Sequence, residues 1–379
     1  PSYRHTLLSL HKSLVDTPSI TGTEGATGSF LVEYLTSRNY IAQLQFLPPH
    51  ANTPPGAERF NVVAWPSPAS RNPSPRVLVT SHIDVVPPHI PYHINSSDST
   101  IDTADAYTLI GGRGSVDAKA SVAAQIVAVE SLLSSEAIAP EDVMLLFVVG
   151  EEKSGDGMLH FSSSLSKLDP PPRFAAAVFG EPTENKLACG HKGISVGRVK
   201  AKGKAGHSGY PWLGKSATEV LMRAVVKVLD TDLGSSERYG NTTVNVGTIA
   251  GGVAANVIPK EAEALLAVRI AVGNETTGSD IVRDAIQKVL DETDGEALSL
   301  EWPGGGYGPI ECDCDVDGFE TMVANYGTDL PHLKGDHVSY LYGPGTILVA
   351  HGDDEALQVR DLETAVEGYK TLIKHALEL

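Results

Sequence analysis

The chain has 379 residues, of which 41% are hydrophobic and 20% charged, and its formal net charge is −18 at pH 7. A chain of this length exceeds the size at which one hydrophobic core usually keeps growing, so we expect two domains. The negative charge would repel a phosphate backbone and argues against a nucleic-acid partner. No apolar run approaches the roughly 18 residues of a membrane span, which argues against a membrane partner.

The first domain is expected to be α/β, with a mixed central sheet and helices on both of its faces, because strand and helix patterns alternate along the chain. Apolar residues recur at helical spacing near the N-terminus, in an alanine-rich and valine-rich stretch and at the C-terminus. These helices are predicted at 7–15, 29–35, 121–133 and 362–377. Short apolar runs typical of buried strands are found at 76–80, 143–149, 174–179 and 346–349.

The texture of the sequence changes from about residue 194, where longer runs with partial alternation begin. Three strands and two amphipathic helices are predicted there, which is typical of an α+β layer of the ferredoxin-like kind. The strands are expected at 194–202, 243–249 and 262–270, and the helices at 217–229 and 280–290. We therefore expect an inserted lid or dimerisation domain at 194–300, with the first domain formed by 1–193 and 301–379.

Five short polar clusters interrupt the apolar elements. They comprise residues 81–84, 112–117, 151–152, 180–182 and 351–355. Four of the five follow a run that is predicted as a buried strand. Because ligands bind at the carboxyl ends of strands in open α/β sheets, we expect the clusters to converge on one site.

Within these clusters, several side chains have complementary chemistry. On an extended backbone residues i and i+2 share a side, so Asp84 can accept a hydrogen bond from the ring of His82 and orient it toward a metal. Glu151 and Glu152 point apart at a strand end, which lets Glu152 bind metal while Glu151 takes a proton from water. The glycines before Asp117 let the backbone carry that carboxylate close to a metal.

Each of these signals is weak alone. A His-X-Asp triplet is most often coincidence, a glycine-rich segment a flexible turn, and a Glu-Glu pair a solvated surface. Glu181 alone is typical of a loop or cap, and His351 of an ordinary buried histidine. The positions of the clusters after predicted strands favour a shared site.

Three residues of the inserted segment have two interpretations. His207 lies in a glycine-rich segment and is either part of a surface turn or an oxyanion donor brought in by domain closure. Asn256 is similarly ambiguous. Arg269 is ambiguous as well, although the planar guanidinium of arginine is well suited to bind a substrate carboxylate through two hydrogen bonds.

The cysteines and the glycosylation triplets bear on the compartment. Cys189, Cys312 and Cys314 form neither a disulfide framework nor a zinc spacing, so they are interpreted as free or incidental. The triplets at Asn95, Asn241 and Asn274 fit the N-glycosylation pattern. Together with a start at Pro1, which suits a removed presequence, they favour a secreted or vacuolar glycoprotein over a cytoplasmic protein.

Taken in order, the five clusters resemble the di-zinc metallopeptidase family that contains aminoacylase, N-acetylornithine deacetylase, succinyl-diaminopimelate desuccinylase and glutamate carboxypeptidase. The resemblance covers nearly the whole chain. It implies that one zinc ion is bound by His82, Asp117 and Glu181, and the other by Asp117, Glu152 and His351. Two zinc ions per chain are therefore expected, with Co²⁺ or Mn²⁺ able to substitute.

The resemblance also implies the remaining roles. Glu151 corresponds to the general base, and Asp84 to the carboxylate behind the metal-binding histidine. His207 corresponds to a histidine that, in dimeric members, reaches the partner subunit's site and stabilises the tetrahedral intermediate. Asn256 and Arg269 correspond to residues that hold the substrate carboxylate.

The expected activity is zinc-dependent hydrolysis of an amide bond. We favour a metallo-carboxypeptidase that releases a C-terminal amino acid from a peptide. The alternative is an N-acyl amino acid deacylase similar to N-acetylornithine deacetylase. A hypothesis from another class is a non-catalytic dimeric binding protein, which would hold at most one metal. The expected partners are a small peptide or N-acyl amino acid and a second copy of the chain, bound through the inserted domain.

Overall fold

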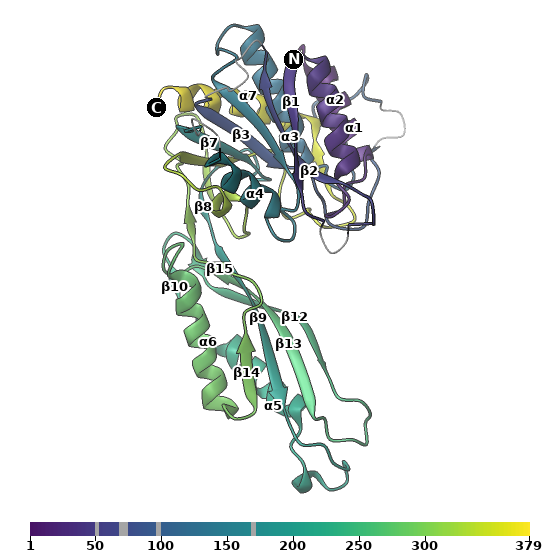
Figure 1. The fold of residues 1–379 in the computed structure, drawn as a ribbon, viewed down its shortest axis with the longest axis vertical. Helices are drawn as coiled ribbons and strands as arrows, with labels where there is room; N and C mark the ends of the chain where they lie inside the picture. The colour runs from purple at the N-terminus through teal and green to yellow at the C-terminus, as the bar shows by residue number, and fades with distance from the viewer. Residues whose placement is uncertain (50–52, 68–74, 96–99, 168–171) are drawn as a thin grey trace. The chain divides into compact units, whose positions relative to one another are not determined.

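The computed structural model describes residues 1–49, 53–67, 75–95, 100–167 and 172–379 (Figure 1). These residues divide into two compact units. The first unit consists of Pro1–Cys189, Cys312–Met322 and Thr328–Leu379, and the second of Gly190–Glu311 and Val323–Gly327. The segment 194–300, expected as an insertion, lies within the second unit.

The first unit is built on a mixed sheet. Its strands follow the order β1 (Tyr40–Leu47), β2 (Arg59–Pro66), β6 (Val143–Val148), β3 (Val77–His82), β7 (Ala176–Gly180), β18 (Val338–Tyr342) and β8 (Leu187–His191). β3 runs parallel to β6 and β7, and β7 parallel to β18, whereas β1, β2 and β6 pair antiparallel. β3, β6 and β7 are buried at every position, as parallel strands covered on both faces must be.

Helices cover both faces of this sheet, as predicted. Phe60 and Asn61 are successive residues of β2 and therefore point to opposite faces. The ring of Phe60 lies against Gly28, whereas the Asn61 side chain donates to the Gly157 carbonyl oxygen at 2.8 Å. Gly28 belongs to α2 (Gly25–Ser37) and Gly157 to α4 (Asp156–Leu165), so these two helices lie on opposite faces.

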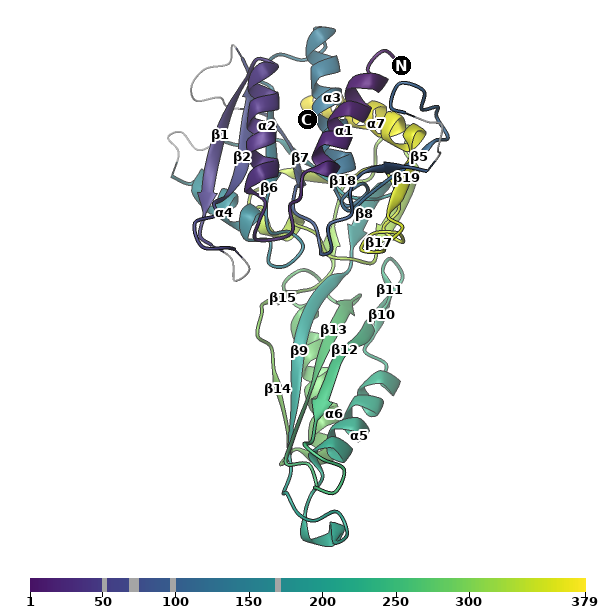
Figure 2. The same ribbon diagram turned by 90° about the vertical axis from the view of Figure 1, so that its right-hand side faces the viewer.

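The larger core lies on the α2 face. It also contains residues of α1 (Arg4–Asp16), α3 (Lys119–Ser134) and α7 (Val359–Leu377), which Figure 2 shows on the same side as α2. α3 is buried along almost its whole length because α1 and α7 pack on it. Its run of small and branched apolar residues suits this position, since a helix that is apolar all round must be covered all round.

The second unit is a separate α+β layer. In chain order it contains β9 (Gly193–Lys202), α5 (Ala217–Asp230), β12 (Thr243–Gly251), β13 (Glu261–Ile270), α6 (Gly278–Asp294) and β14 (Leu298–Glu301). The antiparallel sheet has the order β12-β13-β9-β14, and α5 and α6 pack on it and on each other. This βαββαβ arrangement is ferredoxin-like, as predicted.

Short elements complete the chain. Three of them, β19 (Ala356–Gln358), β5 (Leu109–Gly111) and β4 (His93–Ile94), form a small sheet in that order. The others are β10 (Ser235–Ser236), β11 (Gly240–Asn241), β15 (Gly306–Tyr307), β16 (Ile310–Glu311), β17 (Thr321–Ala324) and the 3₁₀ turns Pro211–Leu213 and Leu330–His332. Among the described residues, no helix has the length and hydropathy needed to cross a membrane.

The strand predicted at 346–349 is wrong. Thr346 makes only an isolated bridge to Thr183, residues 347–349 form turns, and Leu348 is 85% exposed. The strand that enters the sheet here is β18, which ends at Tyr342. Gly345 then adopts a left-handed backbone conformation, with φ of +75°, and turns the chain out of the sheet.

The interpretation of the cysteines as incidental is wrong for two of them. Cys189 and Cys314 form a disulfide, with their Cα atoms 4.9 Å apart. Both belong to the first unit, but they are 125 positions apart in the sequence. Only the tertiary fold brings such distant residues within bonding distance.

Candidate metal centre

The parallel strands of the first unit deliver polar side chains to one edge of the sheet. His82 is the last residue of β3, and Glu181 directly follows β7. Glu151 and Glu152 follow β6 after two intervening residues. Because β3, β6 and β7 are parallel, their carboxyl ends lie at the same edge. The sheet therefore explains why these side chains meet.

One group consists of three buried side chains. His82 Nε2 lies 3.0 Å from Asp117 Oδ1 and 3.8 Å from Glu181 Oε1. The ligand atoms of all three residues lie within 4.8 Å of one another, which is close enough to share one metal ion. Asp117 reaches the sheet edge from the segment just before α3.

A second group shares Asp117. His351 Nε2 lies 3.3 Å from Asp117 Oδ2 and 3.0 Å from Glu152 Oε2. Asp117 thus directs one carboxylate oxygen to each histidine, as a bridging ligand would. His351 is carried by the turn after β18, and its side chain is 52% exposed. The two groups contain the same residues as the two ligand sets that the family resemblance implies.

Asp84 lies behind both groups, but its contacts differ from the expected ones. His82 Nδ1 is 3.0 Å from the backbone oxygen of Asp84 and 3.6 Å from its carboxylate. A proton on Nδ1 that is donated to this carbonyl leaves Nε2 with its lone pair facing Asp117 and Glu181. The carboxylate instead accepts hydrogen bonds from the N–H groups of Glu151 and Glu152, at 3.1 and 3.3 Å, and from the hydroxyl of Thr21 at 2.8 Å.

The clustered carboxylates give the centre an excess of negative charge, which bound cations would neutralise. Burial raises the pKa of Glu181 well above its ordinary value, and burial together with Asp117 raises that of Glu152. Burial alone would lower the pKa of His82, but the hydrogen bond to Asp117 and the nearby Asp84 carboxylate raise it well above 6.5. Hydrogen bonds to Asp117 and Glu152 raise the pKa of His351 to about 10. The carboxylates thus outnumber the cations that could neutralise them.

A pair of divalent cations fits this donor set. Imidazole nitrogens and carboxylate oxygens are the ligands of catalytic zinc, and they also accept Mn²⁺ and Co²⁺. Glu152 Oε1 is buried and has no hydrogen-bond partner among the described residues, so this oxygen is available as a metal ligand. Cations would balance the buried carboxylates that burial otherwise penalises.

Glu151 has the properties of a proton acceptor. It follows Gly150 on the turn held by Asp84, and it belongs to neither metal group. Burial, and next the neighbouring Glu181, raise the pKa of Glu151 well above its ordinary value. A carboxylate whose pKa is raised can take up a proton and release it again in one catalytic cycle.

The structure places the other three predicted residues in the second unit. His207 is exposed, and its Nδ1 accepts a hydrogen bond from the Gly209 N–H at 3.0 Å. Asn256 is also exposed, and its backbone oxygen accepts from the Ser208 N–H at 3.0 Å, so His207 and Asn256 lie on neighbouring segments. Arg269 is half-buried on β13, opposite Thr243 and Ile194.

Sequence reasoning missed an acidic residue near the centre. Asp329 is 4% exposed, and its Oδ1 lies 3.1 Å from His332 Nδ1. It contributes to the raised pKa values of Glu151 and Glu181, so its carboxylate lies within electrostatic reach of both. No strand precedes it directly, because it opens the 3₁₀ turn Leu330–His332. The sequence therefore carried no signal of the kind that identified the other acids.

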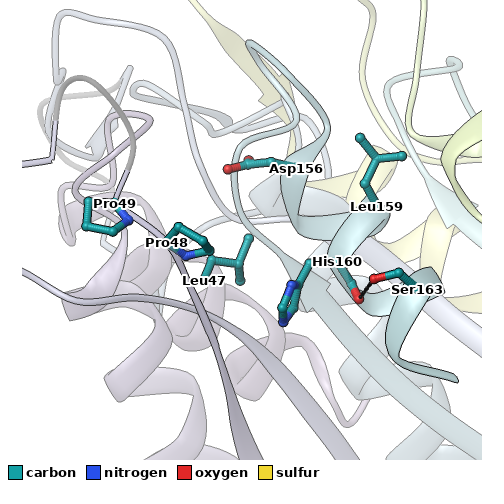
Figure 3. A pocket seen from close by; sticks show the side chains of 7 residues that line it. All are labelled: Leu47, Pro48, Pro49, Asp156, Leu159, His160 and Ser163. Carbon is teal, nitrogen blue, oxygen red and sulfur yellow. Dashed lines mark hydrogen bonds between the residues drawn. The ribbon is translucent and has the colours of Figure 1, made fainter. Parts of the chain in front are cut away.

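A surface pocket of about 470 Å³ is lined by residues of neither metal group (Figure 3). Figure 3 shows side chains of α4 on one side and the end of β1 with the following prolines on the other. Its Asp156 is paired with Arg59 at 2.8 Å. The lining contains none of the predicted ligands, so we do not regard the pocket as the functional site. The lining residues are Leu47, Pro48, Pro49, Asp156, Leu159, His160 and Ser163.

A mixed α/β sheet with two acid-histidine groups at its edge, followed by a ferredoxin-like layer, defines the class as a metallopeptidase-like hydrolase. A protein of Sordaria macrospora described as a peptidase M20 domain-containing protein is 65% identical over 391 residues, covering 100% of this chain and 86% of that protein. A probable carboxypeptidase of Talaromyces marneffei is 46% identical over 399 residues, covering 98% of this chain and 86% of that protein. Residues 189–297 match the peptidase dimerisation domain of the M20 family.

Solved structures show the same fold. A tripeptidase from Staphylococcus aureus superimposes with a TM-score of 0.77 at 19% identity, covering 99% of both chains. A protein from Bacillus subtilis described as a dinuclear metal-binding peptidase of the M20 family superimposes with a TM-score of 0.66 at 16% identity, covering 100% of this chain and 99% of that one. The chain belongs to the M20 peptidase family. It is a metal-dependent peptide hydrolase.

Proposed function

We propose that this chain is a di-zinc carboxypeptidase that releases the C-terminal amino acid of a peptide. The observation that carries the proposal is Asp117, which directs one oxygen to each of two histidines that stand in separate metal groups. The name of the 46% identical relative supports the choice of carboxypeptidase within the family. We assign His82, Asp117 and Glu181 to one zinc ion, and Asp117, Glu152 and His351 to the other.

The residues of the chain divide the work of hydrolysis. Two bound zinc ions would lower the pKa of a water molecule and polarise the scissile carbonyl. Glu151 takes the proton from the attacking water and passes it to the leaving amine, which its raised pKa favours. Asp84 holds the backbone of Glu151 in place for this transfer. Glu152 stays charged as a ligand, so the neighbouring glutamates have separate tasks.

Substrate recognition is assigned to residues of the second unit. Arg269 offers a planar fork of N–H donors, which suits the free C-terminal carboxylate of a peptide. Asn256 supplies a neutral donor, and His207 a donor for the oxyanion of the tetrahedral intermediate. The family resemblance supports these three roles. Substituting Arg269 should raise KM for carboxylate-bearing substrates more than it lowers kcat.

We also propose that the chain forms a homodimer through the second unit. The match to a dimerisation domain over 189–297 supports this. On α5, Met222, Val226 and Leu229 are 52%, 55% and 50% exposed although all are apolar. Their spacing places them on one face of the helix. β12 is an edge strand of the adjacent sheet, and its Ile249 is 55% exposed. Apolar patches and open sheet edges are typical protein interfaces.

A secreted or vacuolar location is proposed on two grounds. The Cys189–Cys314 disulfide is typical of oxidising compartments. Asn241 and Asn274 are exposed, so a glycosylating enzyme could reach them. Asn95 is exposed as well, but Ser96 and Ser97 of its triplet lie outside the described residues.

The deciding experiment is a substrate screen with zinc supplied. The purified chain is offered N-blocked dipeptides, the same dipeptides with an amidated C-terminus, and N-acetyl amino acids including N-acetylornithine. A carboxypeptidase cleaves the first set and not the second, because amidation removes the carboxylate. Preference for N-acetyl amino acids would support the deacylase instead. No turnover of any set, with fewer than two zinc ions bound per chain, would support the non-catalytic binding protein.

A further inference from the structure

A buried ion pair joins two distant segments of the first unit next to the metal groups. Arg113 and Glu355 are each 1% exposed and are 242 positions apart in the sequence. Arg113 Nη1 donates to Glu355 Oε2 at 2.7 Å. Neither side chain belongs to either metal group, so the pair does not itself bind metal.

The arginine holds the turn that carries His351. Its guanidinium donates to the backbone oxygens of Gly352 at 3.0 Å and of His351 at 3.2 Å. It also donates to the Pro88 oxygen at 3.3 Å. The His351 backbone is left-handed, with φ of +65°, a conformation that is uncommon for residues other than glycine. Two of the carbonyl contacts of Arg113, to His351 and Gly352, lie in this turn and help to hold it.

The glutamate holds the segment that carries Asp117. Its Oε1 accepts hydrogen bonds from the N–H groups of Val116 at 2.9 Å and of Asp117 at 3.1 Å. Its backbone oxygen accepts from the Ser115 hydroxyl at 3.0 Å and the Gly112 N–H at 3.1 Å. One residue therefore fixes the backbone of Asp117 and, through Arg113, that of His351.

We infer that Arg113 and Glu355 are positioning residues that set the distance between Asp117 and His351, and that they determine how tightly the His351 group binds its metal. The inference rests on the proposed two-metal centre. Stability alone is a poor reason for this pair, because a buried ion pair contributes little more than well-packed apolar residues. Apolar residues could not supply the hydrogen-bond donors and acceptors that hold the segments of Asp117 and His351.

The test compares stepwise zinc binding of chelator-stripped wild-type protein and the R113K variant by titration calorimetry. Lysine keeps the charge opposite Glu355 but cannot donate to the carboxylate and all three carbonyls at once. We expect one zinc equivalent to weaken by about 10-fold to 100-fold, as when the hydrogen-bond partners behind metal ligands are removed, while the other changes by less than about threefold. Co²⁺ loading should show the loss in the visible spectrum of one equivalent only.

Two further variants keep the test decisive. E355Q removes the negative charge of the Glu355 side chain without changing its size. It should weaken the binding of the same zinc equivalent, and it provides an independent test if R113K fails to fold. E363Q is the control, because Glu363 on α7 also pairs with an arginine far away in the sequence, Arg4 Nη2 at 2.9 Å, but touches no metal-group residue. E363Q should lower the unfolding midpoint and leave both zinc affinities unchanged.

The outcomes separate the two claims. Wild-type protein that binds fewer than two zinc ions contradicts the metal centre itself. Wild-type protein with two zinc ions, together with R113K and E355Q variants that bind both normally or lose both equally, contradicts only the positioning role. An equal effect of E363Q would do the same, since it would reduce the result to a general loss of stability.

Discussion

Asp84 accepts a hydrogen bond on its carboxylate from the backbone N–H of Glu151, at 3.1 Å. The same carboxylate accepts from the next residue, Glu152, at 3.3 Å. A single buried side chain thus supports the proposed base and a proposed ligand through their backbones. Its role in orienting His82 is carried mainly by its carbonyl oxygen, 3.0 Å from the ring.

Replacing Asp84 with Asn should therefore damage catalysis without removing the side chain's bulk. An amide NH₂ would face one of the two backbone N–H groups that the carboxylate now accepts, so the turn must shift. We expect kcat to fall by about 10-fold to 100-fold and metal binding to weaken, because substitution of residues that hydrogen-bond to metal ligands usually has effects of this size. Steady-state kinetics at saturating zinc check this. D142N is a suitable control. The Asp142 carboxylate accepts a hydrogen bond of 2.7 Å from the Ala139 N–H and makes no contact with the metal groups. The variant should therefore behave as wild type.

Glu151 can be tested apart from metal binding. The E151Q variant retains the size of the side chain but cannot accept a proton, so kcat should fall by about 10²-fold to 10⁴-fold. Because Glu151 belongs to neither metal group, the zinc content measured by metal analysis should stay at the wild-type value. Wild-type turnover by E151Q would refute the assignment, and loss of zinc would make Glu151 a ligand.

Metal removal should make the stability of the protein depend on pH. In the metal-free chain the pKa values of Glu181 and Glu151 are raised, with burial as the first cause, and that of His351 is raised to about 10 by Asp117 and Glu152. A group with a raised folded-state pKa contributes stability below its unfolded pKa and loses it as pH rises through the folded value. The metal-free protein should thus lose stability as pH rises.

Metal binding should oppose this loss, because the ligands must be deprotonated to bind. The difference in Tm between zinc-loaded and chelator-treated protein should grow between about pH 6 and pH 8. Differential scanning fluorimetry across this range measures it. A difference that is constant with pH would show that the clustered residues do not exchange protons for metal.

The disulfide should stabilise the first unit. Cys189 and Cys314 close a long loop, with a sequence separation of 125 residues. Loss of such a cross-link in the C314S variant should lower the free energy of unfolding by about 2–5 kcal/mol. Urea unfolding under oxidising conditions measures the effect. C312S is the control, since Cys312 is not part of this bond, and dithiothreitol should bring wild-type protein to the level of C314S.

The proposed dimer depends on the exposed face of α5. V226D places a charge in the middle of the apolar positions Met222 and Leu229, so a dimer through this face should dissociate. Sedimentation velocity should then show a monomer with unchanged zinc content. L159D is a matched control, because Leu159 is 45% exposed on α4 of the first unit. A monomeric wild-type protein would contradict the proposed dimer, and a V226D variant that stays dimeric would place the interface elsewhere.

Strand patterns in the sequence identified most of the fold and most of the centre. The apolar runs before His82, Glu151 and Glu181 became β3, β6 and β7, because fully buried parallel strands need apolar residues on both faces. The same logic failed at 346–349, where the apolar run forms a partly buried turn with Val349 packed against the core. Local pattern cannot distinguish a strand from a turn that packs some of its apolar residues.

Local spacing by itself determined which chemical groups this chain carries, at which strand ends they lie, and that a ferredoxin-like layer interrupts the first unit. Only the tertiary structure decided which distant groups meet. The pairing of Cys189 with Cys314, the placement of Asp329 within electrostatic reach of Glu151, and the link from Arg113 to Glu355 all involve segments far apart along the chain. Such contacts depend on how the sheet and its loops pack in three dimensions. The periodicity of apolar residues reports only local structure, so it does not predict these contacts.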